Sequence, residues 1–219
     1  MPTLSISEIY YTLLGESSAV GAPCAIVRLS GCHRRCSYCD SAYAFNGGTS
    51  LTLSEVLGRI AGLGAPRVLV TGGEPLQQTA SPELMRRLIA DGREVWLETS
   101  GTVGGVPLAD VPEGVRRIVD VKTPASGVPA DEVDWAGLRD LGPRDELKFV
   151  CCDRADYDWA RALVCEGARL PAGVPVAFSP AEGRLAPAEL ADWIIADRLD
   201  VRFQIQLHKA LWPGRERGI

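Results

Sequence analysis

The stretch Cys32-His33-Arg34-Arg35-Cys36-Ser37-Tyr38-Cys39 carries three cysteines at the spacing CxxxCxxC. It directly follows an apolar, β-branched run at residues 25–29 that predicts a buried strand. Three neighbouring thiolates do not complete a structural zinc site, which almost always has four protein ligands. A 4Fe-4S cluster bound by three cysteines keeps one iron open for another molecule. We therefore predict such a cluster on Cys32, Cys36 and Cys39. The alternatives are a zinc loop completed by His33 or His208, or three core thiols.

Buried runs of the same kind recur along the chain. They lie at residues 68–71, 94–97, 117–121, 147–151, 176–179 and 202–207. Helical spacing of apolar residues occurs between most of them, at residues 53–63, 82–90, 131–141, 157–165 and 187–195. Residues 101–114 contain four Gly and two Pro, which predicts a loop. Alternating strands and helices form βα units on a parallel sheet, and about six units are too few for a closed eightfold barrel. We predict an α/β fold, a partial (β/α) barrel in one domain over residues 1–219.

Composition narrows the function classes. The 219 residues are 46% hydrophobic with a net charge of −5, which gives no electrostatic footprint for nucleic acid or an anionic membrane. The first 20 residues contain no Lys or Arg, so the charged start of a signal peptide is missing. We expect a cytoplasmic protein with a small-molecule partner, no nucleic acid and no membrane. The other four cysteines, Cys24, Cys151, Cys152 and Cys165, are predicted to be buried thiols.

Polar motifs follow several of the predicted strands. Thr71-Gly72-Gly73-Glu74-Pro75 follows the second strand, where glycines let the backbone approach a ligand and Glu74 offers a carboxylate to an amine. A plain turn is the alternative for this segment. Residues 98–101, 120–122, 179–180 and 206–209 end later strands in the same way. Because the carboxyl ends of parallel strands lie on one rim, we expect these motifs to converge there.

With an aromatic residue, Tyr38, before its last cysteine, the CxxxCxxC run resembles the signature of the radical S-adenosylmethionine (radical SAM) superfamily. Gly73-Glu74 resembles the glycine-rich segment of that superfamily. The resemblance implies a partial barrel of the radical SAM type. It also implies that S-adenosylmethionine binds the open iron and is cleaved by one electron to a 5'-deoxyadenosyl radical. The implied cofactor contacts are Tyr38, Cys39, Asp40, Gly73, Glu74, Gly101, Asp120, Val121 and Lys122.

Further segments resemble one family, the 7-carboxy-7-deazaguanine synthases of queuosine and 7-deazapurine biosynthesis. They are residues 8–16, 27–32, 39–41, 98–102, 146–150 and 206–208. The resemblance implies a lyase that contracts the ring of 6-carboxy-5,6,7,8-tetrahydropterin to 7-carboxy-7-deazaguanine and releases ammonia. In that reaction the radical removes hydrogen at C6, and hydrogen return regenerates S-adenosylmethionine.

The same resemblance implies the remaining contacts. A magnesium ion would be bound at Ser41, whose hydroxyl is the kind of oxygen ligand that Mg²⁺ takes. The planar fork of Arg28 suits a substrate carboxylate, and Glu16 could accept from guanine-like N–H groups. The substrate residues are Leu13, Leu14, Gly15, Glu16, Arg28, Thr99, His208 and Ile219. An electron donor such as flavodoxin or ferredoxin and a homodimer are also implied.

Two other functions compete with this one. An activase of a glycyl-radical enzyme also uses a short CxxxCxxC chain, but its substrate is a protein. A non-enzymatic zinc or iron–sulfur module would have four protein ligands, and its cluster spectrum would not respond to S-adenosylmethionine.

Overall fold

A computed structural model describes residues 2–101 and 103–219, and a nine-stranded sheet forms its centre. The strands are β1 Thr3–Leu13, β2 Pro23–Leu29, β3 Thr49–Thr52, β4 Arg67–Gly72, β5 Glu94–Thr99, β6 Arg116–Asp120, β7 Glu146–Cys151, β8 Val176–Pro180 and β9 Arg202–Phe203. Their order is β3-β1-β2-β4-β5-β6-β7-β8-β9. From β2 to β9 the neighbours are parallel, whereas β1 is antiparallel to β2 and β3. The sheet does not close, so the predicted partial barrel is confirmed.

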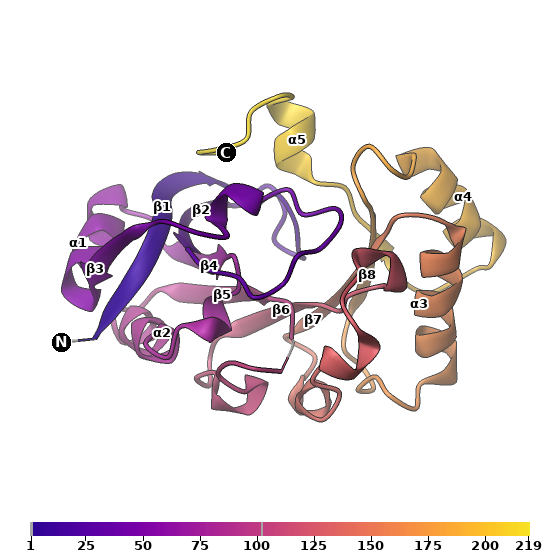
Figure 1. Cartoon of the computed structure of the whole chain (residues 1–219), viewed down its shortest axis with the longest axis horizontal. Coiled ribbons are helices and arrows are strands. Elements are labelled where there is room, and N and C mark those ends of the chain that lie inside the picture. Colours follow the sequence, from indigo (N-terminus) through magenta and orange to yellow (C-terminus); the bar gives the residue numbers. More distant parts are fainter. Residues whose placement is uncertain (1, 102) are drawn as a thin grey trace.

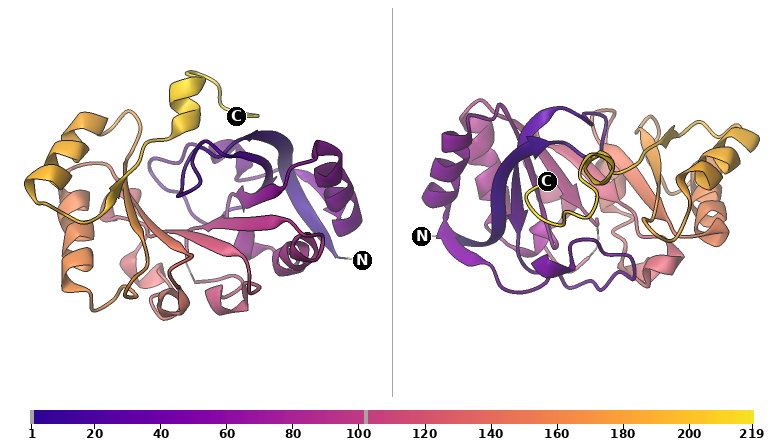
Figure 2. Two further views of the ribbon diagram at one scale, coloured as in Figure 1. Left: turned by 180° about the vertical axis from the view of Figure 1, so that it is seen from behind. Right: turned by 90° about the horizontal axis from the view of Figure 1, so that it is seen from above.

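Four helices cover one side of this curved sheet: α1 Leu53–Leu63, α2 Ser81–Ala90, α3 Arg154–Glu166 and α4 Pro187–Ala196 (Figure 1). Local chemistry sets their ends. At α1, Thr52 and Glu55 form a capping box, and Gly64 ends the helix in the left-handed region at φ 64°. The short α5, Leu207–Leu211, and the C-terminal end lie across the opposite, open side of the sheet (Figure 2). No described helix is both long and apolar enough to cross a membrane.

The two faces of the sheet carry different layers because side chains alternate along each strand. Outward side chains such as Val27, Val70 and Phe149 join the main core beneath the helices. The inward side chains form a separate apolar cluster, the floor, which consists of Leu14, Cys24, Ile26, Leu69, Trp96 and Ile118. Trp96 is the largest of them and is 1% exposed. The next inward position on β2, β5 and β6 is charged, so a layer of charged side chains lies directly above this floor.

Some predicted elements differ from the structure. The helix predicted at residues 131–141 is wrong, because this segment forms two short 3-10 turns, Ala130–Glu132 and Gly137–Asp140. The Asp134 side chain accepts from the Gly137 N–H at 2.9 Å, and the Asp134 N–H donates to the Gly101 carbonyl at 2.9 Å. Both bonds replace helical ones.

The ends of the sheet also differ from the sequence interpretation. The strand predicted at residues 202–207 is limited to β9, and α5 begins at Leu207. Neither β1 nor β3 was predicted, since neither is a continuous buried run. The loop predicted at residues 101–114 contains a 3-10 turn, Leu108–Asp110, among its described residues.

Three of the four other cysteines are buried as predicted. Cys24, Cys151 and Cys152 are at most 6% exposed. Cys165 is exposed near the end of α3, so its predicted burial is wrong.

Replacing Trp96 with Ala should cost about 3–5 kcal/mol of unfolding free energy, because it empties the centre of the floor. Urea unfolding of the metal-free protein measures the change. The matched control is Trp212→Ala at the half-buried residue that follows α5, with an expected loss under about 1 kcal/mol. Equal losses in both variants would contradict the floor as a packed layer.

Candidate active site

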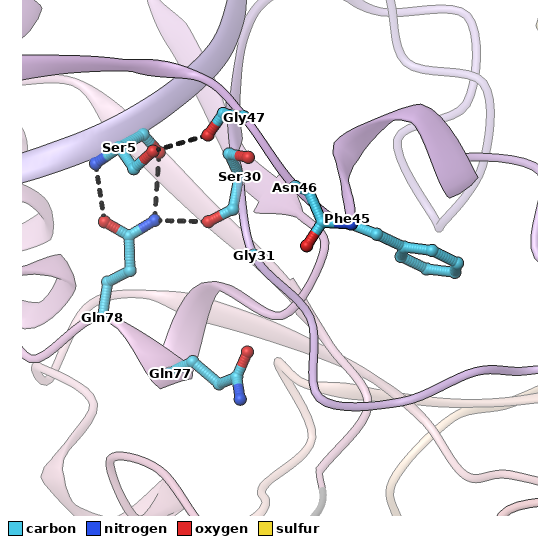
Figure 3. A pocket seen from close by; sticks show the side chains of 8 residues that line it. All are labelled: Ser5, Ser30, Gly31, Phe45, Asn46, Gly47, Gln77 and Gln78. Carbon is cyan, nitrogen blue, oxygen red and sulfur yellow. Dashed lines mark hydrogen bonds between the residues drawn. The ribbon is translucent and has the colours of Figure 1, made fainter.

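The cysteine loop, residues 30–48, leaves the end of β2 and is tied to the sheet at its first residue. The Gln78 side chain accepts from the Ser5 N–H at 2.8 Å and donates to the Ser30 carbonyl at 2.8 Å (Figure 3). Beside this tie lies an open hollow of about 580 Å³ lined by Ser5, Ser30, Gly31, Phe45, Asn46, Gly47, Gln77 and Gln78. None of the predicted substrate residues lines it.

Gly72 and Gly73 bring the end of β4 against the start of the cysteine loop. A Cβ on Gly73 would lie 2.1 Å from the Gly31 carbonyl oxygen and 2.9 Å from Cys32 Cβ. A Cβ on Gly72 would lie 2.2 Å from the Leu29 carbonyl oxygen. The two glycines therefore allow the chain to approach its own backbone and so fix the position of Cys32.

Glu74 lies in the same turn and is 3% exposed. Its Oε1 accepts from Leu76 N at 3.0 Å and from Thr99 Oγ1 at 2.7 Å. Its Oε2 accepts from the N–H and the hydroxyl of Ser100 at 2.8 and 2.5 Å. Because four donors already use this carboxylate, an amine ligand would have to displace one of them. Thr99 is likewise buried and committed to Glu74.

The three cysteines fit the binding of an iron–sulfur cluster. All three are half-buried, and the Arg34 N–H donates to Cys32 Sγ at 3.4 Å, the kind of bond that tunes a cluster sulfur. Burial raises the pKa of each thiol. No three His, Cys, Asp or Glu side chains of the described chain are placed to bind one metal ion. A cubane has no such requirement, since each cysteine binds a different iron.

Next to this loop, the end of β6 supplies a paired Asp120 and Lys122. Lys122 Nζ lies 2.8 Å from Asp120 Oδ2 and 5.6 Å from the centre of the Tyr38 ring. Between them Val121 is fully buried in the main core, and its N–H donates to the Lys148 carbonyl. Asp120, Lys122 and Tyr38 thus come together, while the Val121 side chain points away from them.

Gly101 follows β5 in the left-handed region at φ 57°. A Cβ there would lie 2.3 Å from Val119 Cγ1, so only glycine fits.

Arg28 lies on the inward side of β2, and its side chain is 14% exposed. Its Nε donates to Glu8 Oε1 at 2.8 Å. Among the described residues, the hydrogen bonds of its two terminal nitrogens are long, at 3.4 Å to Ser41 Oγ and to Tyr10 Oη. The paired N–H groups of the guanidinium fork are therefore available for a carboxylate bound beside Ser41.

The C-terminal end lies next to this arginine. Tyr10 donates through its hydroxyl to the Ile219 carbonyl at 2.7 Å, and Ile219 is 8% exposed. Arg217 stacks on the Tyr43 ring at 4.3 Å, and Tyr43 donates to Glu8. The structure thus brings Ile219 and Arg28 together through Tyr10.

The turn between β1 and β2 crosses the floor and meets α5. The Leu14 side chain is 1% exposed within the floor, and the Leu14 N–H donates to the Ala22 carbonyl. Neither the side chain nor the N–H of Leu14 is therefore free for a ligand. The Leu207 N–H donates to the Gly15 carbonyl at 2.9 Å. A Cβ on Gly15 would lie 2.0 Å from His208 Nδ1, so glycine is required for the imidazole to pack there. Burial lowers the pKa of His208. Leu13, the last residue of β1, leads into this turn.

Asp40 joins the cysteine loop to α5. Gln206 Nε2 donates to Asp40 Oδ2 at 2.7 Å, and Lys209 Nζ lies 3.3 Å from the same oxygen. Although burial opposes it, the charge of Lys209 holds the pKa of Asp40 below its ordinary value. Asp40 Oδ1 accepts from the Ser41 hydroxyl at 2.9 Å.

The centre of the site is Lys148, which sequence reasoning did not single out. Its Nζ lies 2.5 Å from Glu16 Oε2, 2.7 Å from Glu98 Oε1 and 3.7 Å from Asp120 Oδ2. Its side chain is 7% exposed. Burial raises the pKa of Glu16, whereas the ammonium of Lys148 lowers the pKa of Glu98 although burial opposes this. The sequence does contain one indication of this role, because Lys148 is a charged residue within the otherwise apolar strand segment LKFVC of β7.

Comparison with known proteins gives the chain its relatives. Residues 26–151 match the Radical SAM superfamily profile. The chain is 42% identical to a 7-carboxy-7-deazaguanine synthase of Koribacter versatilis, over 99% of this chain and all of that protein. It is 41% identical to one of Chlorobaculum tepidum, over 99% and 97% of the two chains. The crystal structure of QueE from Escherichia coli shares the fold, with a TM-score of 0.74 and 21% identity over 93% and 94% of the chains.

Replacing Gly15 with Ala should release α5, because the new Cβ would collide with His208. We expect faster tryptic cleavage after Lys209, Arg215 and Arg217, measured by mass spectrometry of timed digests. The control, Gly62→Ala on the exposed side of α1, meets no atom within 4 Å and should stabilise the helix by about 1 kcal/mol. Unchanged cleavage in Gly15→Ala would show that α5 does not depend on this contact.

Proposed function

The chain belongs to the radical SAM superfamily and, within it, to the 7-carboxy-7-deazaguanine synthases, and on this basis we propose the reaction that it performs. It converts 6-carboxy-5,6,7,8-tetrahydropterin to 7-carboxy-7-deazaguanine and ammonia, a step of queuosine and other 7-deazapurine biosynthesis. Substrate and products balance without a net oxidant or reductant, since the pterin loses one ammonia. When bound, the 4Fe-4S cluster and S-adenosylmethionine supply the radical that removes hydrogen at C6.

One observation carries the proposal: the three-cysteine loop begins at the end of the strand that holds Arg28, with Ser41 and Glu16 on the same side. In this arrangement the two terminal nitrogens of Arg28 bind the substrate carboxylate. Glu16 accepts from N–H groups of the pterin ring, and the glycines at 72 and 73 hold Cys32 in place. A radical activase, whose substrate is a protein, has no use for this small polar site.

Magnesium is proposed at Ser41. The Ser41 hydroxyl, with Asp40 Oδ1 at 2.9 Å, offers oxygen ligands of the kind that Mg²⁺ prefers. Arg28 lies 3.4 Å from the same hydroxyl, so one substrate carboxylate could bind both the ion and the guanidinium. The ion would neutralise and orient that carboxylate.

The remaining contacts follow the family resemblance. We propose that Tyr38, Cys39, Asp40, Gly73, Glu74, Gly101, Asp120, Val121 and Lys122 contact S-adenosylmethionine, Val121 through its backbone. His208 and the Ile219 end would line the substrate site from α5 and the tail. Leu13, Leu14, Gly15 and Thr99 would shape that site from below. Reduction of the cluster before turnover calls for a donor such as flavodoxin or ferredoxin, and we propose a cytoplasmic homodimer.

The test of this function is anaerobic turnover. The reconstituted protein receives dithionite, S-adenosylmethionine, Mg²⁺ and 6-carboxytetrahydropterin, and mass spectrometry detects 7-carboxy-7-deazaguanine. Cys36→Ala should abolish both the cluster absorbance and the product. Cys165→Ala, at an exposed thiol outside the loop, should retain both. Cleavage of S-adenosylmethionine by the intact protein without product would reject the substrate, and a colourless zinc-bound protein would favour the binding module.

Replacing Arg28 with Lys should raise KM for the pterin tenfold to a hundredfold, because a point charge replaces a bidentate fork worth about 1.5–3 kcal/mol. Steady-state kinetics at saturating S-adenosylmethionine measures the change. Arg67→Lys, at the N-terminal end of β4 and paired with Glu94, is the control and should leave KM unchanged. An unaltered KM in Arg28→Lys would place the carboxylate elsewhere.

A further inference from the structure

We propose that Lys148 is a positioning residue: its ammonium holds one oxygen of Glu16 so that the other is presented, in ionised form, to the N–H groups of a guanine-like ring. This inference rests on the proposed function and adds a residue to it. Lys148 itself is buried beneath Glu16 and would not touch the substrate.

The two glutamates bound by Lys148 differ in what they leave free. Glu98 uses both oxygens within the protein, Oε1 for Lys148 and Oε2 for the Thr71 hydroxyl at 3.2 Å. Glu16 uses only Oε2, at 2.5 Å from Lys148 Nζ. Across the described residues, no hydrogen bond reaches Glu16 Oε1. Glu16 therefore retains acceptor capacity, whereas Glu98 acts as a support for the lysine.

Every element around Glu16 contributes charge to this arrangement. Lys148 comes from β7, Glu98 from β5, and Asp40 from the cysteine loop. Asp120 of β6 faces Lys148 and is itself paired with Lys122, while Arg28 of β2 acts on Glu98. His208 of α5 lies against Gly15, next to Glu16 in the chain. In this group Lys148 is the cation in direct contact with Glu16.

Recognition of the ring depends on the charge of this carboxyl. An ionised carboxylate is an acceptor only, which suits adjacent N–H and NH₂ groups, whereas a protonated one turns a donor toward them. Burial raises the pKa of Glu16, and Lys148 is the strongest influence that lowers it. Removing the ammonium must therefore raise the pKa of Glu16. As the pH falls, the carboxyl is then protonated, and ring binding is lost, at a higher pH than in the wild type. At a pH below the wild-type pKa, each unit of increase in the pKa lowers the affinity for the ring tenfold.

The experiment measures binding rather than turnover alone. Calorimetry follows 7-carboxy-7-deazaguanine binding to the anaerobic holoenzyme between pH 6 and 9, in two buffers of different ionisation enthalpy. For Lys148→Met we expect at least tenfold weaker binding at pH 7, recovery toward pH 9, and more protons released on binding. KM for the pterin should follow the same profile, with a smaller change in kcat. Cluster absorbance and S-adenosylmethionine binding report that the variant is folded.

The matched control removes another ion pair from the same sheet. Arg117→Met breaks the pair with Asp145 on the outer face of β6, at 2.6 Å, and should leave the pH profile of binding unchanged. A wild-type profile in Lys148→Met, or the same shift in Arg117→Met, would overturn the proposal.

Where Lys148→Met folds, adding it to Glu16→Gln should cause no further loss of product binding, and a further loss of tenfold or more in the double variant would overturn the proposal. Where Lys148→Met does not fold, Glu16→Gln decides alone, because it keeps Lys148 paired with Glu98 and removes the titrating carboxyl. Product binding to Glu16→Gln should then be weak at every pH between 6 and 9, and a wild-type pH profile in this variant would overturn the proposal. A wild-type enzyme that neither binds nor forms the product would instead reject the proposed function.

Discussion

Three carboxylates from three different segments, Glu16, Glu98 and Asp120, meet at the ammonium group of Lys148. Charges this deeply buried are tolerated only when they are paired, and removing one partner of such a group costs about 3–5 kcal/mol. These ion pairs of Lys148 therefore fix the turn between β1 and β2 over the inner face of β5, β6 and β7. A second bond, from Ser18 to Glu146 at the start of β7, anchors the same turn. Gly15 belongs to this turn, and its carbonyl accepts from the N–H of Leu207 at the start of α5. The position of α5 on the open side of the sheet therefore depends on Lys148.

The apolar floor lies beneath the charged groups around Lys148, and it determines where along the strands charged side chains begin. On β2, β5 and β6 the inward side chain is first apolar and then, two residues later, charged: Ile26 precedes Arg28, Trp96 precedes Glu98, and Ile118 precedes Asp120. The charged layer thus lies at the carboxyl ends of the strands, next to the cysteine loop. Apolar packing below keeps water from entering there, which strengthens the interactions of the charged groups above.

The sequence predicted the parallel strands and their helices because buried apolar runs and helix caps are local signals. It did not predict β1, whose side chains alternate in burial and whose pairing with β2 is antiparallel. It predicted a helix where Asp134 and Gly137 instead form a local turn. Two of the strand-end motifs meet, since Thr99 donates to Glu74, and a third reaches the cysteine loop, where Lys122 lies beside the Tyr38 ring. The role of Lys148 required three dimensions, since its partners lie 132, 50 and 28 residues away along the chain.

An anaerobic crystal structure with the iron–sulfur cluster, S-adenosylmethionine and 6-carboxytetrahydropterin bound would show which groups hold the substrate. We expect the substrate carboxylate on the terminal nitrogens of Arg28 and ring N–H groups on Glu16 Oε1, with Lys148 still bound to Oε2. A substrate bound with its ring away from Glu16, or a Lys148 ammonium that has left Glu16 for the substrate, would contradict it.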